Sequence, residues 1–231
     1  MLQATNVIVA YGKREILHGV DFDARPGEVT AIVGPNGSGK TTLLRALSGD
    51  VSYTGTIWLD EREVSGSRPW ELAALRGVLP QATALAFPFT VLEVVRLGLR
   101  RGLEASEAGL VLRALERVGL SGYEGRLYQE LSGGEQQRVQ LARVLCQVWH
   151  PVLEGQAHWL FLDEPVSSLD IGHQLQVMQI ARDYAARGGG VVAVMHDLNL
   201  TAIYAGSVAL ISDGLVQAQD KPQQVLQDEL L

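Results

Sequence analysis

Alternating hydrophobic and polar positions mark the first part of the chain as β-structure. Apolar residues recur at every second position in residues 20–23 and again in 57–60, and a period of two predicts half-buried strands. Residues 29–33, Val-Thr-Ala-Ile-Val, are apolar enough to be buried on both faces, as in the interior of a parallel sheet. A glycine-rich loop and a helix-forming stretch, 40–47, follow, so the pattern predicts strand, loop and helix in succession.

The middle of the chain has a different period. From about residue 82 to 150 the pattern is helical. One apolar stripe is predicted at Ala108, Val111, Leu112, Leu115 and Val118. Strands are predicted again at 159–162 and 191–195, with a helix over 171–187 that ends at a run of glycines. Strands that alternate with helices predict a mainly parallel α/β core, with residues 82–150 inserted into it. The tail after Gly214 mixes polar and apolar residues and has no functional assignment.

Composition limits the class of protein. The 231 residues suffice for one substantial core, and 47% hydrophobic with 19% charged residues is typical of a globular chain. The single cysteine, Cys146, excludes an internal disulfide and is predicted to lie in the core. No window approaches the roughly 20 continuous apolar residues that cross a bilayer, and the first residues do not resemble a secretory signal. We therefore expect a soluble, cytoplasmic chain.

The net charge of −7 disfavours nucleic acid as a partner, because nucleic-acid binders usually carry a basic surface. The cluster Arg96, Arg100 and Arg101 is interpreted as a solvated helix face. His18 and His173 are interpreted as structural residues. His150 and His158, which lie close together in sequence, are interpreted as surface-loop residues rather than metal ligands.

A phosphate-binding loop is the most specific motif. The segment matches the pattern GxxxxGK[ST] between a predicted buried strand and a predicted helix, the context that the motif requires. Its residues are Gly34, Pro35, Asn36, Gly37, Ser38, Gly39, Lys40 and Thr41. Glycines let backbone N–H groups converge on phosphate oxygens, and the helix N-terminus adds donors and partial positive charge. The Lys40 ammonium can reach the β- and γ-phosphates, and the Thr41 hydroxyl can bind Mg²⁺.

Two carboxylates follow the predicted strand at 159–162. In α/β folds the carboxyl ends of strands are where ligands bind, so Asp163 and Glu164 are candidates for the same site as the phosphate loop. Asp163 is suited to hold Mg²⁺ through its water shell. Glu164 is suited to polarise the attacking water, as a base or by orienting it.

A second glycine-bearing segment lies at residues 131–138, Leu-Ser-Gly-Gly-Glu-Gln-Gln-Arg, which we call the signature segment. Ser132 followed by Glu135 predicts a capping box at a helix start. Gly133 and Gly134 are costly residues with which to begin a helix, and a second phosphate-facing helix terminus explains them better. Because two such termini cannot easily serve one nucleotide from the same side, we expect them to serve opposite faces of it.

Taken together, residues 34–42, 131–138 and 160–170 resemble the phosphate loop, signature motif, Mg²⁺ strand and D-loop of ABC (ATP-binding cassette) ATPases, in the family's order. The resemblance covers nearly the whole chain. It implies a P-loop NTPase core with a mainly parallel sheet, an N-terminal antiparallel β subdomain and a helical subdomain at about 82–150, all in one domain, 1–231. ATP and Mg²⁺ are the implied cofactors, and ATP hydrolysis is the implied activity.

The resemblance also assigns individual roles. Gln81 is similar to the Q-loop glutamine that senses the γ-phosphate and binds the metal, and His196 to the switch histidine at the γ-phosphate. Tyr11 lies where the family places an aromatic residue that stacks on adenine. Thr42 and Asp170 complete the implied nucleotide contacts, and Thr41, Gln81 and Asp163 the implied metal ligands.

Family resemblance further implies the partners. Two copies form a head-to-tail homodimer in which Ser132 and Gly134 touch the γ-phosphate of ATP held by the other copy's Lys40. Residues 87–95 are similar to the surface that receives a dimer of membrane-spanning permease subunits, at the cytoplasmic face of the inner membrane. Residues 169–174 and 196–200 look most like importers of iron chelates, haem and cobalamin.

Residues 147–159 look more specifically like haem (hemin) importers, which implies a periplasmic haem-binding protein as an indirect partner. The alternatives are an importer of iron-siderophore or cobalamin, and a nontransport ABC ATPase of iron–sulfur cluster assembly. The substrate does not touch this subunit, so the residues themselves do not separate these possibilities.

Overall fold

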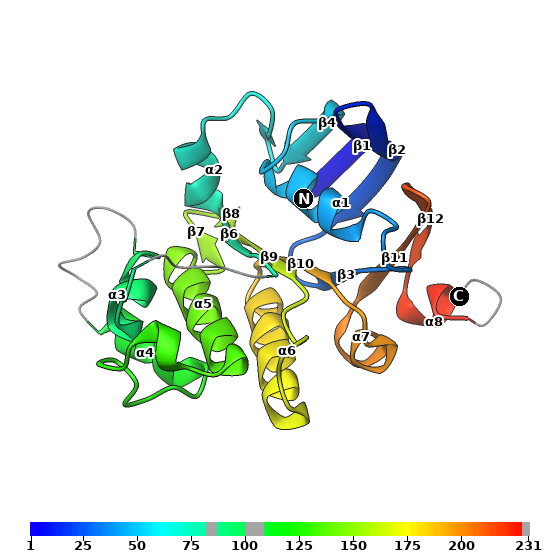
Figure 1. Ribbon diagram of the computed structural model, residues 1–231. Helices are drawn as coiled ribbons and strands as arrows, with labels where there is room; N and C mark the ends of the chain where they lie inside the picture. The colour runs from blue at the N-terminus through cyan, green and yellow to red at the C-terminus, as the bar shows by residue number, and fades with distance from the viewer. Residues whose placement is uncertain (82–86, 100–108, 228–231) are drawn as a thin grey trace.

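A six-stranded, mostly parallel sheet forms the centre of the computed structural model, which describes residues 1–81, 87–99 and 109–227 (Figure 1). Its strand order is β12-β11-β3-β10-β9-β6, and only β12 runs antiparallel to its neighbour. The strands are β3 (Val29–Val33), β6 (Arg76–Leu79), β9 (Trp159–Asp163), β10 (Gly190–Val194), β11 (Ser207–Ser212) and β12 (Leu215–Asp220). The parallel α/β prediction is confirmed, and the unassigned tail supplies the last strand of this sheet.

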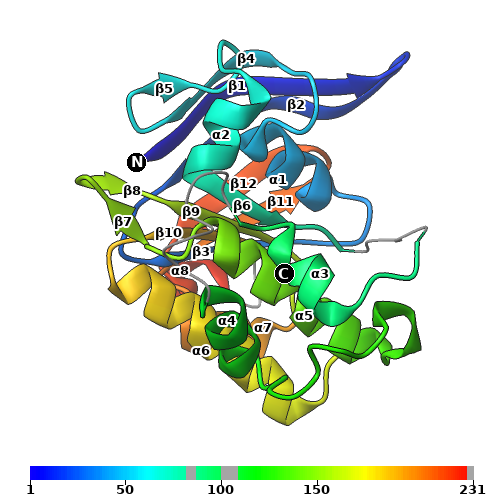
Figure 2. The same cartoon turned by 90° about the vertical axis from the view of Figure 1, so that its left-hand side faces the viewer.

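A second sheet is antiparallel and four-stranded, in the order β2-β1-β4-β5. Its strands are β1 (Leu2–Tyr11), β2 (Arg14–Ala24), β4 (Thr54–Leu59) and β5 (Arg62–Glu63). Figure 2 shows this sheet above the central sheet, with α1 (Lys40–Ser48) between them. The period-two prediction is confirmed at Ile57 and Leu59, which are buried, while Trp58 between them is exposed.

The central sheet separates two hydrophobic cores. On β3, Val29, Ala31 and Val33 pack into one core, and Ile32 packs into the other, as alternating side chains of a strand must. The first core contains the long helices below the sheet in Figure 2, and the second contains α1 and the antiparallel sheet. This burial on both faces explains the continuous apolar run in the sequence.

The remaining helices are short except for two, α5 and α6. They are α2 (Pro69–Leu75), α3 (Val91–Arg96), α4 (Leu110–Arg117), the 3₁₀ helix η1 (Tyr128–Glu130), α5 (Gly133–Gln147), α6 (Ile171–Ala186), α7 (Leu198–Tyr204) and α8 (Pro222–Val225). Helices α3 and α4 both pack on α5, and the three lie together at one end of the molecule (Figure 1). Residues 82–86 and 100–108 lie outside the described residues, and with them Arg100 and Arg101. The inserted subdomain at 82–150 stays a prediction.

Two predictions about single positions are wrong. Leu112 is 49% exposed because it lies outside the buried face of α4. That helix begins at Leu110, and its buried residues are Leu110, Val111, Ala114 and Leu115. Ala108 of the same predicted stripe lies outside the described residues. His158 is buried rather than on a surface loop, and its ring Nδ1 lies 2.7 Å from the carbonyl oxygen of His150. Cys146 is buried, as predicted.

The segment 147–159, which joins α5 to β9, contains a small hairpin of two strands, β7 (Val152–Leu153) and β8 (Gln156–Ala157). His158 follows it and leads into β9. Among the residues described, none of the helices has both the length and the apolar character that a membrane span requires.

Candidate active site

The phosphate loop connects β3 to α1 in a backbone conformation that depends on glycine. Gly34, Gly37 and Gly39 have φ values of 147°, 80° and 105°, in the region that favours glycine. A Cβ at Gly34 would lie 1.9 Å from the carbonyl oxygen of Ile211, and one at Gly39 would lie 2.8 Å from Leu17 Cδ2. These glycines therefore let the loop pack against β11 and β2 as it turns into the helix.

Lys40 is buried at the start of α1, where its Nζ donates hydrogen bonds of 2.8 Å to the carbonyl oxygens of both Gly34 and Pro35. Burial lowers the pKa of Lys40, and the carboxylates of Glu164 and Asp163 partly oppose that shift. The hydroxyl of Ser38 is also buried, and it has no hydrogen-bond partner among the described residues. A phosphate oxygen held by the loop would satisfy it, so the residues present fit the ligand that the motif predicts.

Thr41 and Asp163 meet at the base of this loop. The Thr41 hydroxyl donates a 3.0 Å hydrogen bond to Oδ1 of Asp163, although the two residues are 122 positions apart in sequence. Burial raises the pKa of Asp163, and the hydrogen bond from Thr41 lowers it again in part. One hydroxyl and one carboxylate match the preference of Mg²⁺ for few protein oxygens together with water and phosphate.

Glu164 follows β9 in a left-handed conformation, with φ of 50°. Its carboxylate is 16% exposed and has a partner on each oxygen. His196 Nε2 lies 2.7 Å from Oε1, and Gln81 Nε2 donates to Oε2 at 2.9 Å. Because an ionised carboxylate only accepts, His196 is the donor in the first of these contacts.

These side chains come from adjacent strands of the central sheet. Gln81 follows β6, Glu164 follows β9 and His196 follows β10, in the strand order β10-β9-β6. The carboxyl ends of parallel strands share one edge of the sheet, and the phosphate loop follows β3 at that same edge. The fold thus brings together side chains that are more than a hundred residues apart in sequence.

The signature segment begins α5 with the predicted capping box. Glu135 N donates to Ser132 Oγ at 3.3 Å, and Ser132 N donates to Glu135 Oε2 at 2.8 Å. The hydrogen bonds from Ser132 lower the pKa of Glu135. A Cβ at Gly134 would lie 3.0 Å from the carbonyl oxygen of Ser168, whereas nothing lies within 4 Å of one at Gly133. Close approach to residues 167–170 accounts for one of the two glycines.

Asp170 caps α6, which sequence reasoning did not foresee. Its Oδ1 accepts from His173 N at 3.0 Å, and His173 Nδ1 lies 2.7 Å from Oδ2. The backbone bond from His173 lowers the pKa of Asp170. Asp170 lines a cavity of about 470 Å³ together with Ser132, Gly134 and Arg138.

A different cavity, of about 340 Å³, lies beside the phosphate loop and is lined by Gly34, Pro35, Met195 and His196. It shares no lining residue with the cavity at the signature segment. The phosphate loop and the signature segment therefore line separate cavities. This separation agrees with the head-to-tail dimer that the resemblance implies, in which each nucleotide lies between the phosphate loop of one copy and the signature segment of the other.

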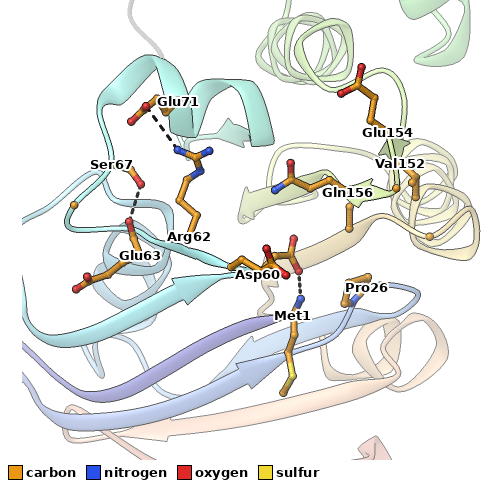
Figure 3. Close-up of a pocket in the computed structure, with 15 residues that line it drawn as sticks. Met1, Pro26, Asp60, Arg62, Glu63, Ser67, Glu71, Val152, Glu154 and Gln156 are labelled. Atoms are coloured by element: carbon orange, nitrogen blue, oxygen red, sulfur yellow. Dashed lines mark hydrogen bonds and ion pairs between the residues drawn. The ribbon is translucent and has the colours of Figure 1, made fainter.

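A larger cavity of about 1230 Å³, to which no residue of the phosphate loop contributes, lies between residues 60–71 and the β7–β8 hairpin (Figure 3). Its charged groups are partly paired with one another. Asp60 contacts the ammonium of Met1, and Arg62 lies 3.7 Å from Glu71. Further acidic side chains line it, so it does not suit a phosphate.

Other predicted site residues lie at the open surface. Tyr11 ends β1 and is 50% exposed, and Asn36 and Gly37 at the tip of the loop are exposed as well. Their assigned contacts stay predictions, as does that of Thr42 on α1.

Sequence reasoning missed Gln137, whose Nε2 donates to the carbonyl oxygen of Glu164 at 2.9 Å. Its spacing from Glu164 gives no signal of that contact.

Known proteins resemble this chain along its full length. The family model described as ABC transporter matches residues 17–167. The hemin import ATP-binding protein HmuV of Jannaschia sp. (strain CCS1) is 64% identical over 231 residues, which cover 100% of this chain and 86% of that protein. HmuV of Mesorhizobium japonicum is 62% identical over 235 residues, covering 100% of this chain and 89% of that one.

Solved structures share the fold. The dimeric structure of a bacterial ABC transporter cassette has a TM-score of 0.80 and 28% identity, over 96% of this chain and 99% of that chain. The structure of an ATP-binding subunit of an ABC transporter has a TM-score of 0.86 over 100% of this chain and 94% of that chain, and at 22% identity it supports the fold alone.

Proposed function

Because the chain belongs to the ABC transporter family, we propose that it is the ATP-hydrolysing subunit that energises import of hemin through a separate membrane subunit. The hemin assignment is supported by full-length relatives at 64% and 62% identity that carry that name. The observation that carries the ATPase assignment is the carboxylate of Glu164, held by Gln81 and His196 at the sheet edge where the phosphate loop begins.

ATP binds with its phosphates on the loop that connects β3 to α1. Lys40 turns its ammonium from the carbonyl oxygens of Gly34 and Pro35 toward the β- and γ-phosphates, and Ser38 supplies a buried hydroxyl. Thr41 and Asp163 hold the Mg²⁺ that accompanies the nucleotide, with Gln81 as a further ligand. Bound Mg²⁺ would neutralise the negative charge that develops on the phosphate oxygens during hydrolysis.

Hydrolysis depends on Glu164. Its carboxylate orients the attacking water and accepts a proton from it, and His196 Nε2 donates to the γ-phosphate. In the present structure His196 donates to Glu164 instead, so nucleotide binding exchanges that contact for one with phosphate. Positioning and electrostatics contribute most of the rate enhancement in phosphoryl transfer.

Two copies act as a head-to-tail homodimer. The signature segment of one copy, with Ser132, Gly133 and Gly134 at the start of α5, faces the nucleotide on the phosphate loop of the other. The phosphate loop and the signature segment line separate cavities, which supports this arrangement, because one chain cannot close both segments on one nucleotide. Asp170, at the start of α6, and Tyr11, which stacks on adenine, complete the contacts.

The membrane partner docks at residues 87–95. Phe87 is 68% exposed. The Thr90 hydroxyl caps α3 by accepting a hydrogen bond from Glu93 N, and Thr90 N donates a 2.8 Å hydrogen bond to Glu93 Oε2. An exposed aromatic side chain beside a rigid helix start is suited to receive a helix of another subunit. The chain then lies at the cytoplasmic face of the inner membrane, bound to a permease dimer that meets a periplasmic haem-binding protein on the other side.

The test is ATP hydrolysis in vesicles that contain the permease subunits and this chain. Addition of the hemin-loaded binding protein is expected to raise kcat several-fold, while an iron-siderophore or cobalamin binding protein leaves it unchanged. Stimulation by one of those other carriers would move the assignment to that substrate class. Co-purification with a soluble assembly complex in place of a membrane subunit would favour the nontransport alternative in iron–sulfur cluster assembly.

A further inference from the structure

Gln137 connects the signature segment to Glu164 within one chain. It lies in the first half of α5, and its Nε2 donates a 2.9 Å hydrogen bond to the backbone carbonyl oxygen of Glu164, 27 positions later in sequence. Two carbonyl-type oxygens would repel each other at this distance, so the amide of Gln137 must present its nitrogen to Glu164. The contact is thus a directed bond from one functional segment to another.

The backbone of Glu164 needs external support. A left-handed conformation in a residue other than glycine is unfavourable and persists only where neighbours impose it. β9 ends at Asp163, one residue earlier, so the sheet does not hold the Glu164 carbonyl. That oxygen accepts from Gln137 Nε2, from Ser167 Oγ at 3.2 Å and from Ser167 N at 3.3 Å.

Of these supports, only Gln137 comes from outside the turn that contains Glu164. Ser167 is three residues away and moves with the same segment, whereas Gln137 belongs to a helix whose first residues form the signature segment. A displacement of α5 therefore acts directly on the backbone of Glu164. At the other end of the residue, Gln81 and His196 hold the carboxylate.

We infer that Gln137 is a positioning residue that sets the place of the Glu164 carboxylate and couples it to the signature segment of the same chain. The inference rests on the proposed role of Glu164 in hydrolysis. In the proposed dimer the signature segment contacts the nucleotide of the other copy. Closure on that nucleotide moves α5 and, through Gln137, aligns the Glu164 that serves the chain's own nucleotide.

Gln137→Met is the first test, because methionine keeps the length of the side chain and removes the donor. We expect kcat for ATP to fall about tenfold and KM to stay within about twofold, since binding is untouched and only alignment is lost. Gln137→Glu, which replaces the donor by an acceptor, is expected to lower kcat further. The matched control is Gln147→Met on the same helix, whose amide also donates to backbone carbonyls, those of Ala73 and Arg76.

A double variant separates positioning from a structural role. In a Glu164→Gln background, Gln137→Met is expected to lower residual hydrolysis no further and to leave ATP-dependent dimer formation intact, because its effect passes through the carboxylate. Unchanged kcat in both Gln137 variants, an equal loss in Gln147→Met, or loss of the ATP-bound dimer would each overturn the inference. Near-normal hydrolysis by Glu164→Gln alone would instead refute the proposed role of Glu164, and the inference with it.

Discussion

At the scale of single residues, Glu164 shows how neighbours determine the place of a reactive group. Its φ of 50° is unfavourable for a side chain with a Cβ, and its carboxylate is held by Gln81 and His196. Such strain is retained where the surrounding structure imposes it, and it is common at sites of chemistry. The proposed role in hydrolysis therefore leads to a direct test.

Glu164→Gln is expected to bind ATP with an affinity within about threefold of the parent and to hydrolyse it at least about a hundredfold more slowly, because an amide cannot accept the proton of water. Equilibrium binding and steady-state phosphate release measure the two quantities. Glu116→Gln, an exposed change on α4, serves as the control. Near-normal turnover by Glu164→Gln would refute the assignment.

At the scale of elements, the start of α5 combines a local signal with a tertiary constraint. Ser132 and Glu135 form the capping box that the sequence predicts, and residues 167–170 pack against the first turn. Gly134 has limited room for a Cβ because Ser168 O would lie at 3.0 Å, whereas Gly133 has space. The two glycines are equivalent in sequence and different in the fold.

Alanine substitutions separate them. Gly133→Ala is expected to raise the free energy of unfolding by about 0.5–1 kcal/mol, the usual gain where the new side chain meets no neighbour. Gly134→Ala is expected to show less than half of that gain or a net loss, since the backbone of residues 167–170 must shift. Denaturant unfolding of both variants measures the difference, and equal gains would show that the close contact does not constrain Gly134.

At the scale of the whole molecule, the phosphate loop and the signature segment line separate cavities. The proposed dimer follows from that separation, because a nucleotide on the phosphate loop is enclosed only when another copy brings its signature segment. Assembly and catalysis are then linked. Because ATP binds the dimer more tightly than the monomer, it shifts the monomer–dimer equilibrium toward the dimer.

Ser132→Tyr tests this link, since a bulky side chain at the helix start would occupy the space of the γ-phosphate of the other copy's nucleotide. In the Glu164→Gln background it is expected to abolish ATP-dependent dimer formation in size-exclusion chromatography while ATP binding to the phosphate loop stays within about threefold. Ser121→Tyr, at an exposed serine, is the control. ATP-dependent dimerisation by the Ser132 variant, or full hydrolysis by a strictly monomeric chain, would contradict the head-to-tail arrangement.

Errors in the sequence predictions have physical causes. Leu112 is predicted in the apolar stripe because of its helical spacing from the neighbouring apolar residues, but the start of α4 at Leu110 determines which face is buried. His158 is predicted at the surface because the segment between α5 and β9 is expected to be a loop, but its imidazole is buried with Nδ1 2.7 Å from a backbone oxygen, His150 O. Burial at one position depends on neighbours that sequence spacing does not reveal.

The sequence by itself determined β3, β9 and β10, parts of β2 and β4, the glycine-rich turn, the capping box at Ser132 and the residue types of the site, because periodicity and turn chemistry act over a few residues. Only the tertiary structure decided which side chains meet. The pairs Thr41 with Asp163, Gln81 with Glu164 and Gln137 with Glu164 O form because the strand order β3-β10-β9-β6 and the packing of α5 bring distant segments to one edge. Strand order is a long-range property, and no local pattern encodes it.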